Sequence, residues 1–138
     1  TAFHHSLPEN DRIFAIPKAL TEQGIVRYGF HGLSFQHVAG ALSRRQDVSA
    51  HRRVIIAHLG HGVSLCALED GRSVATTMGM TALDGVPMGR RPGALDPGIV
   101  LYLIEQKGMA PGEVREMLYQ RSGLLGLSGL SSEMQDLL

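Results

Sequence analysis

The feature that most constrains the fold is a series of apolar segments, interrupted by glycines, in the middle of the chain. Residues 54–57 form an unbroken apolar run, which is typical of a strand buried on both faces. Residues 63–68 and 73–77 flank Asp70-Gly71, a dipeptide that favours a tight hairpin turn. The sequence therefore predicts three neighbouring strands, the first two joined through Gly60-His61-Gly62.

Helix signals lie on both sides of these strands. After a short strand predicted at residues 25–28, Ser34 is the expected N-cap of a helix with apolar residues at 3.6-residue spacing, namely Phe35, Val38, Ala39 and Leu42. Asp96-Pro97 and Gly108 mark the beginning and end of another helix, with a buried face predicted at Ile99, Val100, Leu103 and Ile104. A further helix is predicted at residues 111–121. Strands followed by helices favour the α/β class.

Composition excludes several classes of partner. The chain of 138 residues is 43% hydrophobic and 19% charged, which is typical of a globular domain. Thirteen basic and thirteen acidic side chains give a net charge of zero, which argues against nucleic acid or an anionic membrane surface as the main partner. The single cysteine, Cys66, lies in an apolar run, so we expect a small buried side chain and a reducing compartment, the cytoplasm. No apolar stretch reaches the ~18–20 residues of a membrane span.

Three glycine-containing segments carry the candidate chemistry: residues 28–34, 57–64 and 88–93. They place His31, the stretch from His58 through Leu59, Gly60 and His61 to Gly62, and Arg91 where backbone and ligand can approach closely. Such donors suit phosphoryl transfer, which mainly needs positioning and neutralisation of charge. Each segment also has a structural interpretation: a tight turn at residues 60–62, a packed histidine at His31, and a solvated loop arginine at Arg91.

Other site classes lack their patterns. The sequence has no zinc-finger spacing of Cys and His, no P-loop motif and no nucleophile elbow. The irregular segment 78–95, rich in Gly and Pro, is expected to be an ordered active-site loop.

With these residues in view, the chain resembles the acetate kinase family, which also includes propionate and butyrate kinases. Five ordered blocks carry the resemblance, at residues 1–8, 28–34, 58–62, 76–97 and 122–132. The resemblance implies an α/β, ribonuclease-H-like fold of the sugar kinase, heat-shock protein 70 and actin superfamily. It also implies a division into residues 1–50, an inter-domain or substrate-side segment, and 51–138, the first part of a C-terminal ribonuclease-H-like domain.

The activity implied by this resemblance is the reversible transfer of phosphate from ATP to a short carboxylate such as acetate or propionate, with Mg2+, in a cytoplasmic homodimer. His31 and Arg91 match the transition-state-stabilising residues of the family. His58 to Gly62 match the loop that holds the ATP phosphates. The family's catalytic aspartate would lie just before Thr1, and its magnesium ligands and adenosine site outside this chain. We therefore expect the 138 residues alone to be inactive.

Two departures support a competing hypothesis. His61 stands where the family usually has asparagine, and Phe35 replaces a usual second histidine. A domain that kept the fold but lost the chemistry, and that serves as a nucleotide-binding or structural module, is therefore the alternative function.

Overall fold

The structure is a computed structural model that describes residues 2–44 and 53–138. The chain divides into two compact units, Thr1–Ala82 and Leu83–Leu138. The boundary predicted between residues 50 and 51 lies outside the described residues.

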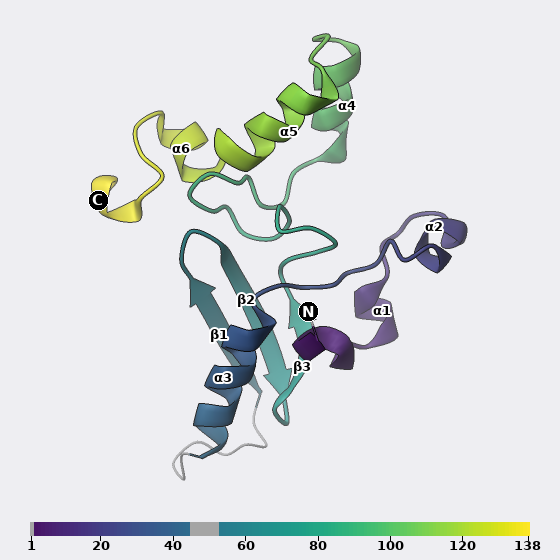
Figure 1. Ribbon diagram of the computed structural model, residues 1–138, viewed down its shortest axis with the longest axis vertical. Helices are drawn as coiled ribbons and strands as arrows, with labels where there is room; N and C mark the ends of the chain where they lie inside the picture. The colour runs from purple at the N-terminus through teal and green to yellow at the C-terminus, as the bar shows by residue number, and fades with distance from the viewer. Residues whose placement is uncertain (1, 45–52) are drawn as a thin grey trace. The chain divides into compact units, whose positions relative to one another are not determined.

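The first unit contains the predicted three-stranded sheet (Figure 1). β1 (Val54–Leu59), β2 (Val63–Glu69) and β3 (Arg72–Thr76) are antiparallel neighbours in chain order. At the β2–β3 turn, Asp70 and Gly71 both adopt left-handed backbone angles, with φ of 51° and 76°, as this type of hairpin turn requires. The strand order and both turns predicted from the sequence are confirmed.

Burial along β1 differs from the prediction. The side chain of Ile56 is buried, whereas that of its neighbour Ile55 is 71% exposed. β1 is an edge strand of an antiparallel sheet, so alternate side chains point to opposite faces and one face is covered here. The prediction of a strand buried on both faces is wrong for the residues described.

The covered face of the sheet packs against α3 (Gly32–Ser43) (Figure 1). Phe35 joins Ile56, Cys66 and Leu68 in a buried cluster, and Val38, Ala39 and Leu42 pack against its edge. This confirms the predicted apolar face of the helix. Cys66 is fully buried as predicted, and burial raises the pKa of its thiol.

The segment leading into α3 departs from the sequence-based prediction. Residues 25–28 form no strand, because the backbone N–H of Arg27 donates to Arg12 O and that of Tyr28 donates to Gly79 O, rather than to one neighbouring strand. The N-cap of α3 is His31, with φ of 57°, and not Ser34. Ser34 instead lies in the first turn, where its side chain makes a long-range contact described below.

The N-terminal part of this unit is built from short helices, η1 (Ala2–Ser6), α1 (Glu9–Arg12) and α2 (Lys18–Glu22). Pro8 and Pro17 precede α1 and α2 directly, where proline is tolerated because helix-starting N–H groups lack intrahelical partners. η1 contacts β3 and α3 and contributes the buried His4.

The second unit is helical. It contains α4 (Pro97–Glu105), α5 (Pro111–Gln120), α6 (Gly123–Ser128) and η2 (Met134–Asp136). Asp96 caps α4 by accepting a hydrogen bond from Gly98 N at 2.8 Å, and Val114 is buried in α5, as expected. The predicted face of α4 is at most half-buried, since no α4 residue is buried among the described residues. α6 was not predicted. No helix in the described ranges is long and apolar enough to cross a membrane.

Candidate functional site

Two histidines predicted as site residues stack on each other in the first unit. The ring centroids of His31 and His58 are 3.9 Å apart with an interplanar angle of 13°. Nδ1 of His31 lies 2.8 Å from Oγ of Ser64, and Nδ1 of His58 lies 2.9 Å from Oγ of Ser34. His31, at the start of α3, is therefore anchored by Ser64 of β2, the strand paired with β1, which carries His58. His58 is anchored by Ser34 of α3.

The strand pattern explains how this cluster forms. His58 of β1 and Ser64 of β2 are direct cross-strand partners, two residues beyond the buried pair Ile56 and Cys66. Because strand side chains alternate, all four lie on the face that α3 covers. His31 and Ser34 lie at the beginning of α3. Their hydrogen bonds to Ser64 and His58 hold this end of the helix against β1 and β2, next to the β1–β2 turn.

Hydrogen bonding at Nδ1 restricts the chemistry available to each ring. A serine hydroxyl can donate to Nδ1 or accept from it, and Ser64 is fully buried. When the Ser64 hydroxyl donates to His31 Nδ1, the remaining ring proton is held on Nε2. The same holds for His58 with Ser34. Such a ring can donate a hydrogen bond from Nε2 to a phosphoryl oxygen.

Another buried histidine supports the segment before His31. His4 is 2% exposed; its Nε2 lies 3.0 Å from Phe30 O and its Nδ1 lies 2.9 Å from Ser73 Oγ. Since a carbonyl oxygen only accepts, Nε2 donates to Phe30 O and Nδ1 accepts from Ser73. Burial lowers the pKa of His4, opposed by the bond to Phe30. A neutral His4 therefore fixes the backbone next to His31.

The glycine turn beside the stacked rings contains the rest of the predicted phosphate loop. Leu59 ends β1 with its side chain 77% exposed, and His61 is exposed in the turn. A Cβ placed on Gly60 would lie 3.7 Å from Gly62 O and 3.8 Å from His58 Nε2, which is ordinary contact. Gly60 also lacks a positive φ, so neither packing nor backbone conformation in the described residues requires a glycine there.

Arg91 lies in the second unit, in an irregular but hydrogen-bonded loop. Met88 N donates to Arg91 O at 2.9 Å, and Ala94 N donates to Gly85 O at 2.7 Å, so the loop is closed twice. Arg91 is half-buried, whereas Arg90 is exposed. The predicted ordered loop is thus confirmed as an irregular segment with internal bonds, and its role in catalysis stays a prediction.

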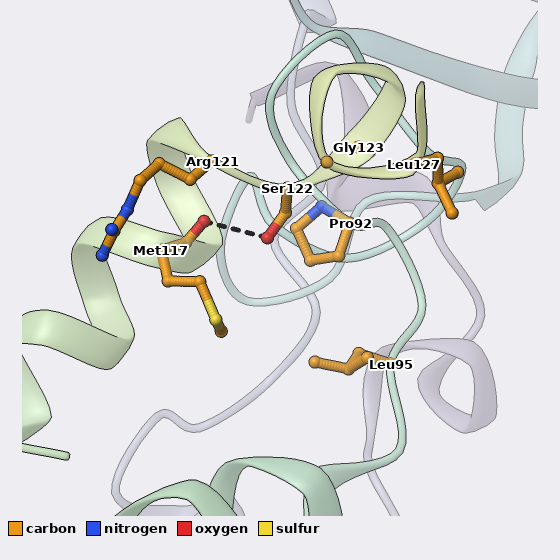
Figure 2. A pocket seen from close by; sticks show the side chains of 8 residues that line it. Pro92, Leu95, Met117, Arg121, Ser122, Gly123 and Leu127 are labelled. Atoms are coloured by element: carbon orange, nitrogen blue, oxygen red, sulfur yellow. Dashed lines mark hydrogen bonds between the residues drawn. The ribbon is translucent and has the colours of Figure 1, made fainter. Parts of the chain in front are cut away.

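A hollow of about 380 Å³ lies between this loop and the helices that follow it (Figure 2). Pro92 and Leu95 line it from the loop, and Met117, Ser122 and Leu127 line it from α5, α6 and their junction. Ser122 Oγ donates to Met117 O at 2.9 Å across the junction, as the dashed line in Figure 2 shows. The lining is mainly apolar and offers no arrangement of acids and bases for catalysis.

Metal-binding side chains do not gather in groups of three among the described residues. Across residues 2–44 and 53–138, no three His, Cys, Asp or Glu side chains come together in a way that could hold a metal ion.

Sequence reasoning missed three supporting residues: Ser34, Ser64 and His4. Ser34 has the residue type of an N-cap, and that local signal hid its contact with His58. Ser64 could have been noticed, because strand alternation places it on the same face as Cys66. His4 gave no local signal, since its partners Phe30 and Ser73 are distant in sequence.

The sequence of the chain is similar to those of proteins from one family. The model of the acetokinase family matches residues 1–138. The acetate kinase of Rhodopseudomonas palustris (strain TIE-1) is 57% identical over 142 residues, which cover all of this chain and 35% of the relative. The acetate kinase of Methylocella silvestris is 51% identical, covering 99% of this chain and 34% of that protein. The chain thus spans about a third of the length of these curated relatives.

Solved structures give the same result. A crystal structure of Porphyromonas gingivalis acetate kinase superposes with a TM-score of 0.92 at 34% identity, covering 99% of this chain and 35% of that one. A propionate kinase from Francisella tularensis gives 0.91 at 39% identity with the same coverage. The predicted α/β fold of the actin-like superfamily is confirmed for this partial chain. The chain belongs to the acetokinase family.

Proposed function

We propose that the protein containing this chain transfers the γ-phosphoryl group of ATP reversibly to a short carboxylate, acetate or propionate, to give ADP and an acyl phosphate. Family membership supports this proposal, as do relatives named acetate kinase and a structural neighbour named propionate kinase. Because the chain spans about a third of these relatives, the activity is proposed for the complete protein.

The observation that carries the proposal is the anchored histidine pair beside Gly60. His31 and His58 stack, and the Nδ1 atom of each lies within hydrogen-bond distance of a serine hydroxyl, which fixes the orientation of both rings. Gly60 follows within two residues of His58 and has no structural need for a glycine. A phosphate chain lying close to the backbone would give that need, because a side chain would block its approach.

In the proposed reaction, a carboxylate oxygen forms a bond to the γ-phosphorus while the bond from that phosphorus to the ADP oxygen breaks. The attacking carboxylate is already an anion, so the step requires no base. The main task of the protein is to hold the two reactants in line and to stabilise charge on the equatorial oxygens. His31 would donate one hydrogen bond to these oxygens.

Arg91 would supply the second donor. Its guanidinium is planar and always charged, so it can bind two phosphoryl oxygens at once. His58 to Gly62 would hold the remaining phosphates of ATP, with His58 donating from its ring and Gly60 giving space for the backbone.

The remaining features are proposed on the same resemblance. ATP would enter with Mg2+, and the complete protein would be a cytoplasmic homodimer acting on small molecules. A neutral net charge and a single buried cysteine, Cys66, are compatible with such a protein.

The test is an assay of acyl phosphate formation by the complete gene product, with acetate and propionate in parallel. Removing one preorganised donor typically costs ~2.7–4 kcal/mol, so Arg91→Ala and His31→Ala should each lower kcat by about a hundredfold or more. Arg91→Lys should restore part of the loss. Arg90→Ala is the control, since this neighbour is exposed and we assign it no role. Equal losses at Arg90 and Arg91 would contradict the assignment.

The alternative of a non-catalytic nucleotide-binding or structural domain makes a different prediction. No carboxylate would be phosphorylated at any pH or substrate concentration tested, and ATP would bind only if the domain binds nucleotides. Of the two departures that favour this alternative, Phe35 is fully buried in the core cluster, so its identity bears on packing. His61 lies in the exposed turn, so it is the departure that bears on contact with a ligand.

A further inference from the structure

We propose that Gly123 and the first turn of α6 position Arg91, by acting as a rigid support against which the Met88–Arg91 bend is held. This inference rests on the proposed function, in which Arg91 contacts the transferring phosphoryl group. Sequence reasoning found no chemistry in residues 122–132. The contacts below give that segment a role within the second unit.

The first turn of α6 uses its backbone donors on the arginine loop. Ser122 N donates to Arg90 O at 3.1 Å, Leu124 N to Met88 O at 2.9 Å and Leu125 N to Gly89 O at 3.0 Å. N–H groups at the beginning of a helix have no partners within the helix, so these loop carbonyls satisfy them. Three consecutive carbonyls of the bend are thereby fixed immediately before Arg91.

Gly123 allows this close approach. A Cβ at position 123 would lie 2.0 Å from Met88 O, 2.7 Å from Arg91 O and 2.9 Å from Arg91 N. All three contacts are with backbone atoms, which cannot rotate away as a flexible side chain could. Any larger residue must therefore displace the bend that carries Arg91.

Two neighbouring features keep the bend from relaxing elsewhere. Met88 is 1% exposed, and its backbone N–H donates to Arg91 O. A Cβ on Gly89 would lie 2.8 Å from Ser132 O, so the outer side of the bend is also in contact with the chain that follows α6. In Figure 2, Gly123 lies at the beginning of α6 close to Pro92, the residue that follows Arg91.

α6 provides a matched control at its other end. Gly123 and Gly129 have almost the same backbone angle, with φ of 63° and 66°. Alanine costs similar backbone strain at both positions, but a Cβ on Gly129 would meet nothing within 4 Å. The difference between Gly123→Ala and Gly129→Ala therefore reports the contact with the arginine bend.

The experiment measures acyl phosphate formation by both variants in the complete gene product. A misplacement of about 1 Å at a catalytic group can cost on the order of a hundredfold, so Gly123→Ala should lower kcat by about tenfold to a hundredfold. We expect Gly129→Ala to stay within about twofold of the unsubstituted protein, because nothing meets its Cβ. Equal losses in the two variants would overturn the inference.

A double-substitution cycle separates positioning from general damage. If Gly123 acts through Arg91, Gly123→Ala should change kcat by less than about threefold when Arg91 is already alanine, because the two effects are then not additive. The same loss in both backgrounds would show that Gly123 acts independently of Arg91 and would overturn the proposal.

Limited trypsin digestion gives a readout that needs no activity. Arg90 is exposed, and its cleavage rate reports how often the bend opens. Gly123→Ala should accelerate cleavage after Arg90, whereas Gly129→Ala should not. Absence of turnover in the unsubstituted protein would refute the proposed function. Unchanged cleavage after Arg90 would refute the support by α6.

Gly89→Ala replaces Gly123→Ala if the latter does not fold. The added Cβ would press on Ser132 O, and position 89 has no positive φ that would add backbone strain. Gly89→Ala should therefore displace the same bend by less than Gly123→Ala does. We expect the same pattern on a smaller scale, with faster cleavage after Arg90 and a kcat loss that depends on Arg91. A fully folded Gly89→Ala protein with unchanged kcat and unchanged cleavage would count against the inference.

Discussion

Replacing Gly60 with alanine should change stability and activity in opposite directions. The added methyl group would lie 3.7 Å from Gly62 O and 3.8 Å from His58 Nε2, and the backbone angle at Gly60 is not left-handed. Alanine therefore fits the described fold without strain. Because alanine restricts the unfolded chain, Gly60→Ala should raise the free energy of unfolding by about 0.4–1 kcal/mol.

Activity should fall in the same variant. If the ATP phosphates lie against the backbone at Gly60, a methyl group displaces them by about 1 Å, which can cost on the order of a hundredfold. We expect a higher KM for ATP, a lower kcat, or both, in the coupled assay with acetate or propionate. The thermal melting temperature of the same preparation gives the stability change.

Gly71→Ala is the matched contrast. A Cβ on Gly71 would meet nothing within 4 Å, but its φ is 76°, so alanine should cost ~1–2 kcal/mol of stability. It lies in the β2–β3 turn, and activity should not change. Unchanged ATP kinetics in Gly60→Ala would refute the phosphate contact. A loss of stability in Gly60→Ala would refute the claim that the β1–β2 turn does not need a glycine at position 60.

Three further predictions concern buried groups of the first unit. The pKa of His4 is lowered from 6.5, so as pH falls the unfolded chain takes up a proton before the folded protein does. The stabilisation by neutral His4 should therefore be complete above pH 6.5 and decline below it. We expect the difference in unfolding free energy between the unsubstituted protein and His4→Gln to shrink as pH falls below 6.5. Exposed His5→Gln is the control, and a constant difference between pH 5 and 8 would contradict this. Ser64→Ala should lower kcat, by releasing His31 Nδ1, but should have no further effect when His31 is already alanine; additive losses would contradict positioning. Phe35→His should lower stability by about 1–3 kcal/mol through burial of an imidazole, with kcat unchanged; a tenfold change in kcat at unchanged stability would place Phe35 in the site.

Turns and helix starts could be predicted from the sequence, because neighbouring residues determine them. The hairpin at Asp70-Gly71 was predictable because both residues accept left-handed backbone angles. α4 was predictable because Asp96 and Pro97 both favour a helix start. Residues 25–28 have the composition of a strand, but their backbone donors bond to Arg12 and Gly79, which no local pattern reveals.

The residues of the candidate site could be named from the sequence, and their role stays a prediction, whereas the contacts that support them could not be predicted. His31, His58 and Arg91 could be named because their residue types suit phosphate and because they lie in glycine-containing segments, where close approach is possible. The serine hydroxyl groups that orient the rings depend on register between β1 and β2 and on the docking of α3. These are tertiary features, whereas the local pattern at Ser34 predicts only a helix cap.

His4 stabilises an unfavourable backbone conformation at His31. A left-handed conformation at a residue other than glycine costs ~1–2 kcal/mol, and His31 has φ of 57°. Hydrogen bonds contribute about 0.5–1.5 kcal/mol each, so the bonds from His4 to Phe30 O and between Ser64 and His31 together offset this cost. A Cβ on Gly29 would lie 2.6 Å from His4 Cδ2, so the segment can adopt this path only with a glycine there. His4 thus holds the backbone that presents His31, as α6 holds the backbone that carries Arg91. In each unit, a segment without chemistry of its own, residues 1–8 or 122–132, supports the side chain that we propose as a donor to the phosphoryl group.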